Sequence, residues 1–259
     1  MFSWSWEPGL LLGLALQALG YLAFVGPLRR WFPGSEPVSQ TRIMTFLLGN
    51  LTLFIALVSP LGTLSDGYLL SAHMVQHLLL TMIAPPLLLI GTPRWLFRPL
   101  LRAPGVLPIA RFLTNPLVAF LAYNVTFTLW HVPQFYEASL SIQPLHITQH
   151  IAFIATATLT WWPVFSPMDE LPPLPQPLQC LYLFVQLLPM KVLAAMITFA
   201  SFVLYPSYEQ APRVWGMSAL VDQQLAGLLM WIPGSIILFT VFTVVFFSFI
   251  NRDEYTTAL

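Results

Sequence analysis

Four of the five histidines in this sequence form two pairs, and the members of each pair are four residues apart. His73 pairs with His77, and His146 pairs with His150. Residues four apart lie on one face of a helix, one turn above the other, so each pair can offer two imidazoles to one metal ion. A fifth imidazole or a carboxylate could complete or orient such a site. The sequence predicts that the candidate metal site consists of His73, His77, His131, His146, His150 and Asp222.

The chemistry of this site is set by what accompanies the imidazoles. Met74 follows the first histidine where a zinc protease motif carries its catalytic Glu, so the motif supplies no general base. Imidazole suits zinc, copper, iron and nickel, and a thioether ligand such as Met217 would favour Cu(I). A structural role is the alternative, because a lone histidine can serve packing and Asp222 can cap the helix that follows it.

The composition indicates the kind of domain that must hold these side chains in place. The chain has 259 residues, of which 57% are hydrophobic and 8% are charged, whereas a soluble domain carries about 25% charged residues. So few charges exclude a soluble surface, and so much apolar and aromatic mass excludes disorder. The net charge is zero, which gives no indication of nucleic acid binding. Residues 1–259 are therefore expected to form a single domain embedded in the lipid bilayer, and the lone Cys180 excludes an internal disulfide.

Seven apolar stretches are long enough to cross the bilayer, which takes about 20 helical residues each. We expect an all-α membrane protein with spanning helices near 8–28, 41–61, 68–91, 116–135, 144–166, 178–204 and 221–250. The last stretch holds Pro233 and Gly234, which favour a kink or a tilt. The N-terminal segment 1–8 has no Lys or Arg, so it lacks the basic start of a cleavable signal peptide.

Basic residues predict the orientation of these helices, because Lys and Arg collect in cytoplasmic loops. Of the ten basic residues, Lys191 lies within the sixth stretch. Eight of the other nine fall in or at the edge of alternate loops or in the tail, and Arg213 is the exception. The eight are Arg29, Arg30, Arg42, Arg94, Arg98, Arg102, Arg111 and Arg252. This bias predicts an N-terminus outside and a cytoplasmic C-terminus. It also places all five histidines and Asp222 in the outer half of the membrane.

The motifs together resemble a known family. The segment from His73 to Leu80, HMVQHLLL, followed by APPLL from Ala84, resembles the signature of the CtaG-type cytochrome c oxidase assembly factors. Further matching segments are Trp130-His131, the His146/His150 pair, DQQLAG from Asp222 and WIPG from Trp231, and the likeness covers about 10–250.

This resemblance implies a multi-pass protein of the bacterial cytoplasmic (inner) membrane that is not itself an enzyme. It implies that the protein helps copper reach a haem-copper oxidase, with the oxidase subunits and a periplasmic copper carrier as partners. Because an oxidase copper centre lies toward the outer side of the membrane, ligands at outer-leaflet depth suit a copper donor. The expected metal is copper, and zinc or haem iron stays open.

Three other functions compete with this one. A multi-histidine iron enzyme of the desaturase type typically needs about eight histidines on the cytoplasmic side, and this chain has five, predicted on the outer side. A b-type cytochrome would hold haem between the third and fifth helices, although a pair four residues apart suits a single metal better than stacked haems. A metal transporter needs polar residues that continue to the inner face, where these helices are nearly all apolar.

Overall fold

Each of the seven predicted apolar stretches folds into helix in the computed structural model, which describes residues 3–257 and the side chains of residues 3–251. The long elements are α1 (Pro8–Val25), α2 (Gln40–Val58), α4 (Leu70–Leu78) continued by the π-helical turn η2 (Leu79–Ile83) and α5 (Ala84–Gly91), α8 (Pro116–His131), α10 (Gln143–Phe165), α11 (Gln176–Phe199) and α13 (Ala219–Thr257). The described residues contain no strand. The all-α fold class is therefore confirmed.

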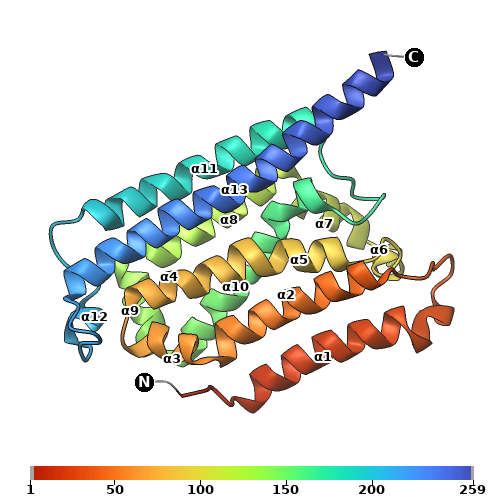
Figure 1. The fold of residues 1–259 in the computed structure, drawn as a ribbon. Coiled ribbons are helices and arrows are strands. Elements are labelled where there is room, and N and C mark those ends of the chain that lie inside the picture. The colour runs from red at the N-terminus through yellow and green to blue at the C-terminus, as the bar shows by residue number, and fades with distance from the viewer. Residues whose placement is uncertain (1–2, 258–259) are drawn as a thin grey trace.

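Short helices lie at the two ends of this bundle (Figure 1). One end carries α3 (Pro60–Gly67), α9 (Pro133–Ser141) and α12 (Pro206–Gln210). The other carries α6 (Arg98–Leu101) and α7 (Val106–Leu113), and η1 (Pro27–Trp31) follows α1. We call the first the histidine end, because His73, His131 and His146 lie on the parts of α4, α8 and α10 nearest to it.

Five helices are long and apolar enough to cross a membrane, and a sixth span results if α7 and α8, which meet at 66°, count as one. The five are α1, α2, α4 to α5, α11 and α13. α10 has 23 residues but is not among them, and it carries two histidines and four threonines. Length and composition thus support five or six of the seven predicted spans. The orientation stays a prediction, and the side chain of Arg252 lies outside the described residues.

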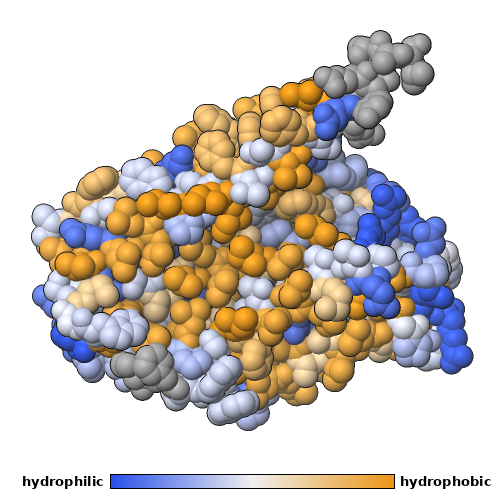
Figure 2. Space-filling model, viewed as in Figure 1, coloured by the Kyte–Doolittle hydropathy of each residue, from blue (hydrophilic) through white to orange (hydrophobic). Residues whose placement is uncertain are grey.

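The surface of the bundle is apolar along the helices and polar at the two ends (Figure 2). Large apolar side chains on the outer helices are strongly exposed, for example Leu16 at 63%, Leu117 at 65% and Phe199 at 74%. Continuous apolar exposure of this extent is unfavourable in water and suits contact with lipid. This surface and the apolar helices indicate a membrane protein.

The span from α4 to α5 is the central one, since 61% of an 18-residue apolar stretch within it is buried, against 11% for α1. Its helical hydrogen-bonding is interrupted by η2 and by Pro85, which has no N–H to offer the carbonyl of Thr81. Trp161 on α10 donates its indole N–H to that carbonyl at 2.8 Å. The break after His77 is therefore satisfied by a neighbouring helix, as membrane proteins require.

Close contact between α11 and α13 depends on Gly227. A Cβ at this glycine would come within 2.2 Å of Thr198 Oγ1 and 2.9 Å of the Ala194 carbonyl oxygen on α11. Small residues allow such approach between membrane helices. α13 then continues as one helix through Pro233, and its first turn reaches the histidine end.

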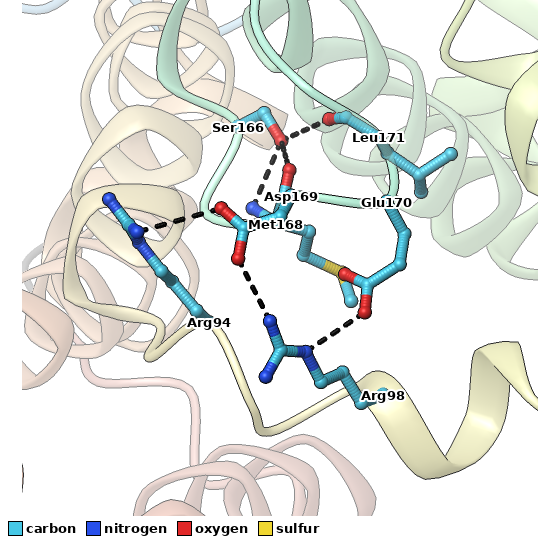
Figure 3. Close-up of polar contacts among 7 residues, drawn as sticks. All are labelled: Arg94, Arg98, Ser166, Met168, Asp169, Glu170 and Leu171. Atoms are coloured by element: carbon cyan, nitrogen blue, oxygen red, sulfur yellow. Dashed lines mark hydrogen bonds and ion pairs between the residues drawn. The ribbon is translucent and has the colours of Figure 1, made fainter. Parts of the chain in front are cut away.

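At the opposite end, the loop 166–175 is tied to the segment that leads into α6 (Figure 3). Arg98 donates from Nε to Glu170 Oε1 at 2.9 Å and from Nη2 to Asp169 Oδ2 at 2.8 Å. Arg94 Nη1 lies 3.5 Å from Asp169 Oδ1. These contacts order a proline-rich loop far from the histidines.

Candidate metal centre

The structure brings all five histidines into one cluster at the histidine end, although they come from three helices. Ring centroids lie 4.2 Å apart for His73 and His77 and 4.4 Å apart for His146 and His150. Between helices, His73 lies 6.2 Å from His146 and 6.5 Å from His150. His77 lies 6.4 Å from His150 and 5.5 Å from His131. The two pairs therefore face each other, and His131 closes the cluster from α8.

The cluster is shielded from water. His73 is fully buried, and His77 and His131 are each 2% exposed. Phe153 packs against His77 with ring centroids 4.6 Å apart, and Phe127 packs against His131 at 4.4 Å. The imidazoles thus lie in an apolar enclosure, where a polar atom without a partner is costly.

His131 is held in a defined tautomer. Its Nδ1 lies 2.6 Å from the Phe127 carbonyl oxygen, which can only accept, so Nδ1 carries the proton. Its Nε2 is buried and has no hydrogen-bond partner. A ring whose one nitrogen donates to a backbone carbonyl presents the lone pair of the other nitrogen, which is the usual arrangement of a metal-ligating histidine.

His73 has a similar arrangement through a tyrosine. Tyr208 Oη lies 3.4 Å from His73 Nδ1 and donates to the Ser65 carbonyl oxygen at 2.5 Å. Tyr136 Oη lies 2.9 Å from Tyr208 Oη. Because the Tyr208 proton goes to Ser65, its oxygen is left to accept from Tyr136 and from His73 Nδ1. Nε2 of His73 is buried without a partner.

Both phenols of this chain of contacts stay protonated at neutral pH. Burial raises the pKa of Tyr136 well above its ordinary value, and the neighbouring Tyr208 adds to this rise. Burial likewise raises the pKa of Tyr208 well above its ordinary value, although the hydrogen bond with Tyr136 opposes it. Tyr208 therefore keeps the proton that it donates to Ser65.

The other three histidines also have free nitrogen atoms. Both ring nitrogens of His77 and Nε2 of His150 are buried without a hydrogen-bond partner. Nε2 of His146 lies 3.5 Å from Asp66 Oδ1, which is an ion-pair distance, and it has no hydrogen-bond partner. The amide of the fully buried Gln149 has no partner either. Polar atoms without partners are thus concentrated on the facing sides of α4 and α10.

Asp222 is placed at the start of α4 and not among the imidazoles. Its Oδ2 accepts from the Leu70 N–H at 2.7 Å and its Oδ1 from the Ser71 N–H at 3.2 Å. The Ser71 hydroxyl also donates to Oδ1. Asp222 therefore caps a helix other than its own, and it positions α4, which carries His73 and His77.

The spacing of the rings can be compared with what one shared metal requires. For a metal–nitrogen bond of about 2 Å and tetrahedral ligands, two imidazole centroids on one ion lie roughly 5 Å apart. The six separations in the cluster run from 4.2 to 6.5 Å. In the described part of the chain, no three His, Cys, Asp or Glu side chains already form a complete ion-binding arrangement. The side chains would therefore have to rearrange before they could bind an ion.

Neither Asp66 nor the tyrosines near His73 were among the predicted site residues. Tyr136 and Tyr208 lie on the short helices α9 and α12, which show no apolar stretch. Lys191, which lies within the sixth predicted stretch, has its Nζ 5.9 Å from the centroid of the Phe239 ring. Met217 lies in the loop before α13, with its N–H donating to the Val214 carbonyl.

The chain was compared with protein families, curated proteins and solved structures. The model of the cytochrome c oxidase caa3 assembly factors matches residues 19–252, a range that includes every histidine. Two uncharacterised proteins, from Mycobacterium bovis and Mycobacterium tuberculosis, are each 27% identical to this chain over 249 residues. The match covers 87% of this chain and 36% of each relative, so the chain spans little more than a third of their length. No solved structure matches the chain. With nine-tenths of its length matched by the family model, the chain belongs to the cytochrome c oxidase caa3 assembly factor family.

Proposed function

We propose that this protein binds copper through its histidine cluster and helps deliver it to a cytochrome c oxidase. The observation that carries the proposal is the cluster itself. Five imidazoles come from three helices, six pairs of them have ring centroids 4.2 to 6.5 Å apart, and each has at least one buried nitrogen without a hydrogen-bond partner. A shared cation would satisfy these nitrogens at once, whereas a packing role leaves their desolvation uncompensated.

Copper is favoured over other metals by the family, because a haem-copper oxidase contains copper that must be inserted. Imidazole suits copper, and the cluster offers no thiolate. The single Cys180 lies near the start of α11, whereas the cluster lies at the other end of that helix. Thiolate holds Cu(I) more firmly than imidazole does, so an all-imidazole site is suited to a donor that must also release its cargo.

The residues around the cluster have separable roles in this proposal. Phe127, through its carbonyl, and Tyr208, through its hydroxyl, each hold an Nδ1 and leave an Nε2 for the ion. Asp222 fixes the N-terminus of α4 and so the face on which His73 and His77 lie. The aromatic enclosure excludes water, which strengthens every electrostatic contact inside it.

The proposed setting follows from the predicted orientation. With the N-terminus outside, the histidine end faces the periplasmic side of the bacterial inner membrane. Oxidase subunits in the same bilayer and a periplasmic copper carrier are then the proposed partners. A haem between α4 and α10 is not favoured, because Phe153 and His131 pack against His77 where a porphyrin would have to lie.

The test is a metal analysis of the purified full-length chain, combined with an optical spectrum. We expect about one copper per chain, as one tetrahedral set of ligands implies, and no haem absorption. Replacing both His73 and His77 with Ala should abolish copper binding. Met74→Leu is the matched control, because it changes a fully buried neighbour on the same helix that carries no imidazole. A chain that contains haem, or a double variant that retains its copper, would overturn the proposal.

A further inference from the structure

The side chains of the histidine end become steadily more buried from Asp66 inward. The Asp66 side chain is 45% exposed and that of His146 is 18% exposed. The next rings, His73 and His77, are 0% and 2% exposed. His146 connects the two levels, since it lies 3.5 Å from Asp66 Oδ1 and its ring lies 6.2 Å from that of His73. A continuous row of ligand-type atoms thus leads from the aqueous surface to the buried cluster.

A second carboxylate contacts the first turn of α10, on which His146 lies. Glu7 Oε1 accepts a 2.9 Å hydrogen bond from Gln143 Nε2, at the first residue of α10. Asp66 lies 3.5 Å from His146, one turn further along the same helix. Both carboxylates therefore contact the beginning of α10, and their negative charges favour a cation there.

The whole histidine end is acidic. Among the residues that the structure describes, this end carries five carboxylates, of which that of Asp222 is buried, against a single guanidinium, that of Arg213. The carboxylates belong to Glu7, Asp66, Glu137, Glu209 and Asp222. Arg213 donates from Nη2 to the backbone carbonyls of Tyr208 and Glu209. An excess of negative charge raises the local concentration of cations and speeds their arrival.

An acidic surface alone would only attract cations, but here buried acceptors lie behind it. Nε2 of the fully buried His73 and both ring nitrogens of His77 have no hydrogen-bond partner. The flanks of the cluster offer no comparable route, because α8 and α10 expose apolar side chains such as Val125 at 61% and Ile151 at 62%. Carrying an ion through lipid-facing hydrocarbon is strongly unfavourable.

We propose that copper is loaded and released through a mouth formed by Glu7, Asp66 and His146, with Asp66 as the first ligand. This inference rests on the proposed copper function. Metal is then exchanged at the aqueous surface of the histidine end and not at the lipid-facing side of the bundle. A partner that supplies copper must then present it from the water phase.

The test measures the rate and the extent of copper loading separately. Full-length protein in detergent is mixed with Cu(I) held by a coloured chelator, and the loss of colour gives both. Asp66→Asn should slow loading roughly tenfold, in the range of electrostatic steering, while the final copper content stays that of the wild type. Glu7→Gln should slow it less, because Glu7 acts through its charge alone. Glu36→Gln is the matched control, since this exposed carboxylate follows η1 at the opposite end of the bundle, and the loading rate of this variant should not change.

The outcomes separate this inference from the function on which it rests. Wild-type loading should slow as salt is added, and Asp66→Asn should lose most of that dependence. If the wild type binds copper and Asp66→Asn loads at the wild-type rate, the mouth is wrong and the copper function stands. If the wild type takes up no copper, both are wrong. A loss of final content in Asp66→Asn, with an unchanged elution profile, would make Asp66 a ligand of the resting site and overturn its role as an entry residue.

Discussion

The Asp222 carboxylate accepts a 2.7 Å hydrogen bond from the backbone N–H of Leu70, although 152 residues separate the two. Leu70 begins α4, so a side chain on α13 satisfies the free N–H groups of another helix. A negative charge at this position is also favoured by the helix dipole. The contact fixes the start of α4 three residues before His73.

Replacing Asp222 with Ala should therefore destabilise the fold and the site together. We expect the free energy of unfolding to fall by about 1–3 kcal/mol, the cost of losing a helix cap and leaving buried N–H groups without a partner. Asp222→Asn, which keeps an acceptor, should cost less. Unfolding of the purified protein in detergent measures this. Asp169→Ala is the control, because its side chain is 58% exposed; equal losses in the two variants would contradict the capping role.

Much of the fold could be predicted because each membrane helix corresponds to a continuous apolar segment of the sequence. All seven stretches are helical, and α2, α10 and α11 begin within two residues of the expected positions. The end of α13 was placed less well, since the helix continues to Thr257 beyond the apolar stretch. The short helices α3, α9 and α12 could not be predicted, because they are held by contacts between distant residues and show no long apolar pattern.

Only part of the site could be predicted from the sequence, because contacts between residues that are distant in the sequence leave no local pattern. Spacing of four residues predicts which histidines share a helix face, and the shared depth predicts that the pairs lie at one end. The partner of Asp222 could not be predicted, because nothing near Asp222 in the sequence indicates a helix 152 residues away. Tyr208 is 135 residues from His73 and was also missed.

Tyr208→Phe should weaken metal binding without removing it. The change deletes the oxygen that faces His73 Nδ1 and leaves the ring free to turn. Loss of such a partner typically costs about 10–100-fold in metal affinity. Competition with a copper chelator measures the affinity. Tyr205→Phe is the matched control, because its hydroxyl donates to the His131 backbone carbonyl at 2.8 Å and not to an imidazole nitrogen. If both variants lose affinity equally, the effect comes from packing and not from orientation of the ring.

Arg98→Ala should loosen the loop 166–175 and leave the metal site unchanged. Arg98 makes both of the short contacts to Asp169 and Glu170 shown in Figure 3. Its side chain is 31% exposed, so solvent screens the pair and the loss of stability should stay within about 1 kcal/mol. Limited proteolysis should cut this loop faster, while copper content stays that of the wild type. Arg94→Ala, which removes a more exposed contact at 3.5 Å, should change neither. Lost copper in Arg98→Ala would show that the two ends of the bundle are coupled.

The last prediction concerns the oxidase in the cell. A host strain whose copy of this protein carries Ala at both His73 and His77 should still insert it in the membrane, because each exchange removes a polar group from an apolar helix. The oxidase subunits should still be made, but the enzyme should lack copper and activity. Copper per haem in the purified oxidase measures this, with a Met74→Leu strain as the control. Extra copper in the medium should restore part of the activity, since it bypasses a donor but not a missing subunit. An oxidase with full copper in the double variant would contradict the donor role, even if the purified protein binds copper.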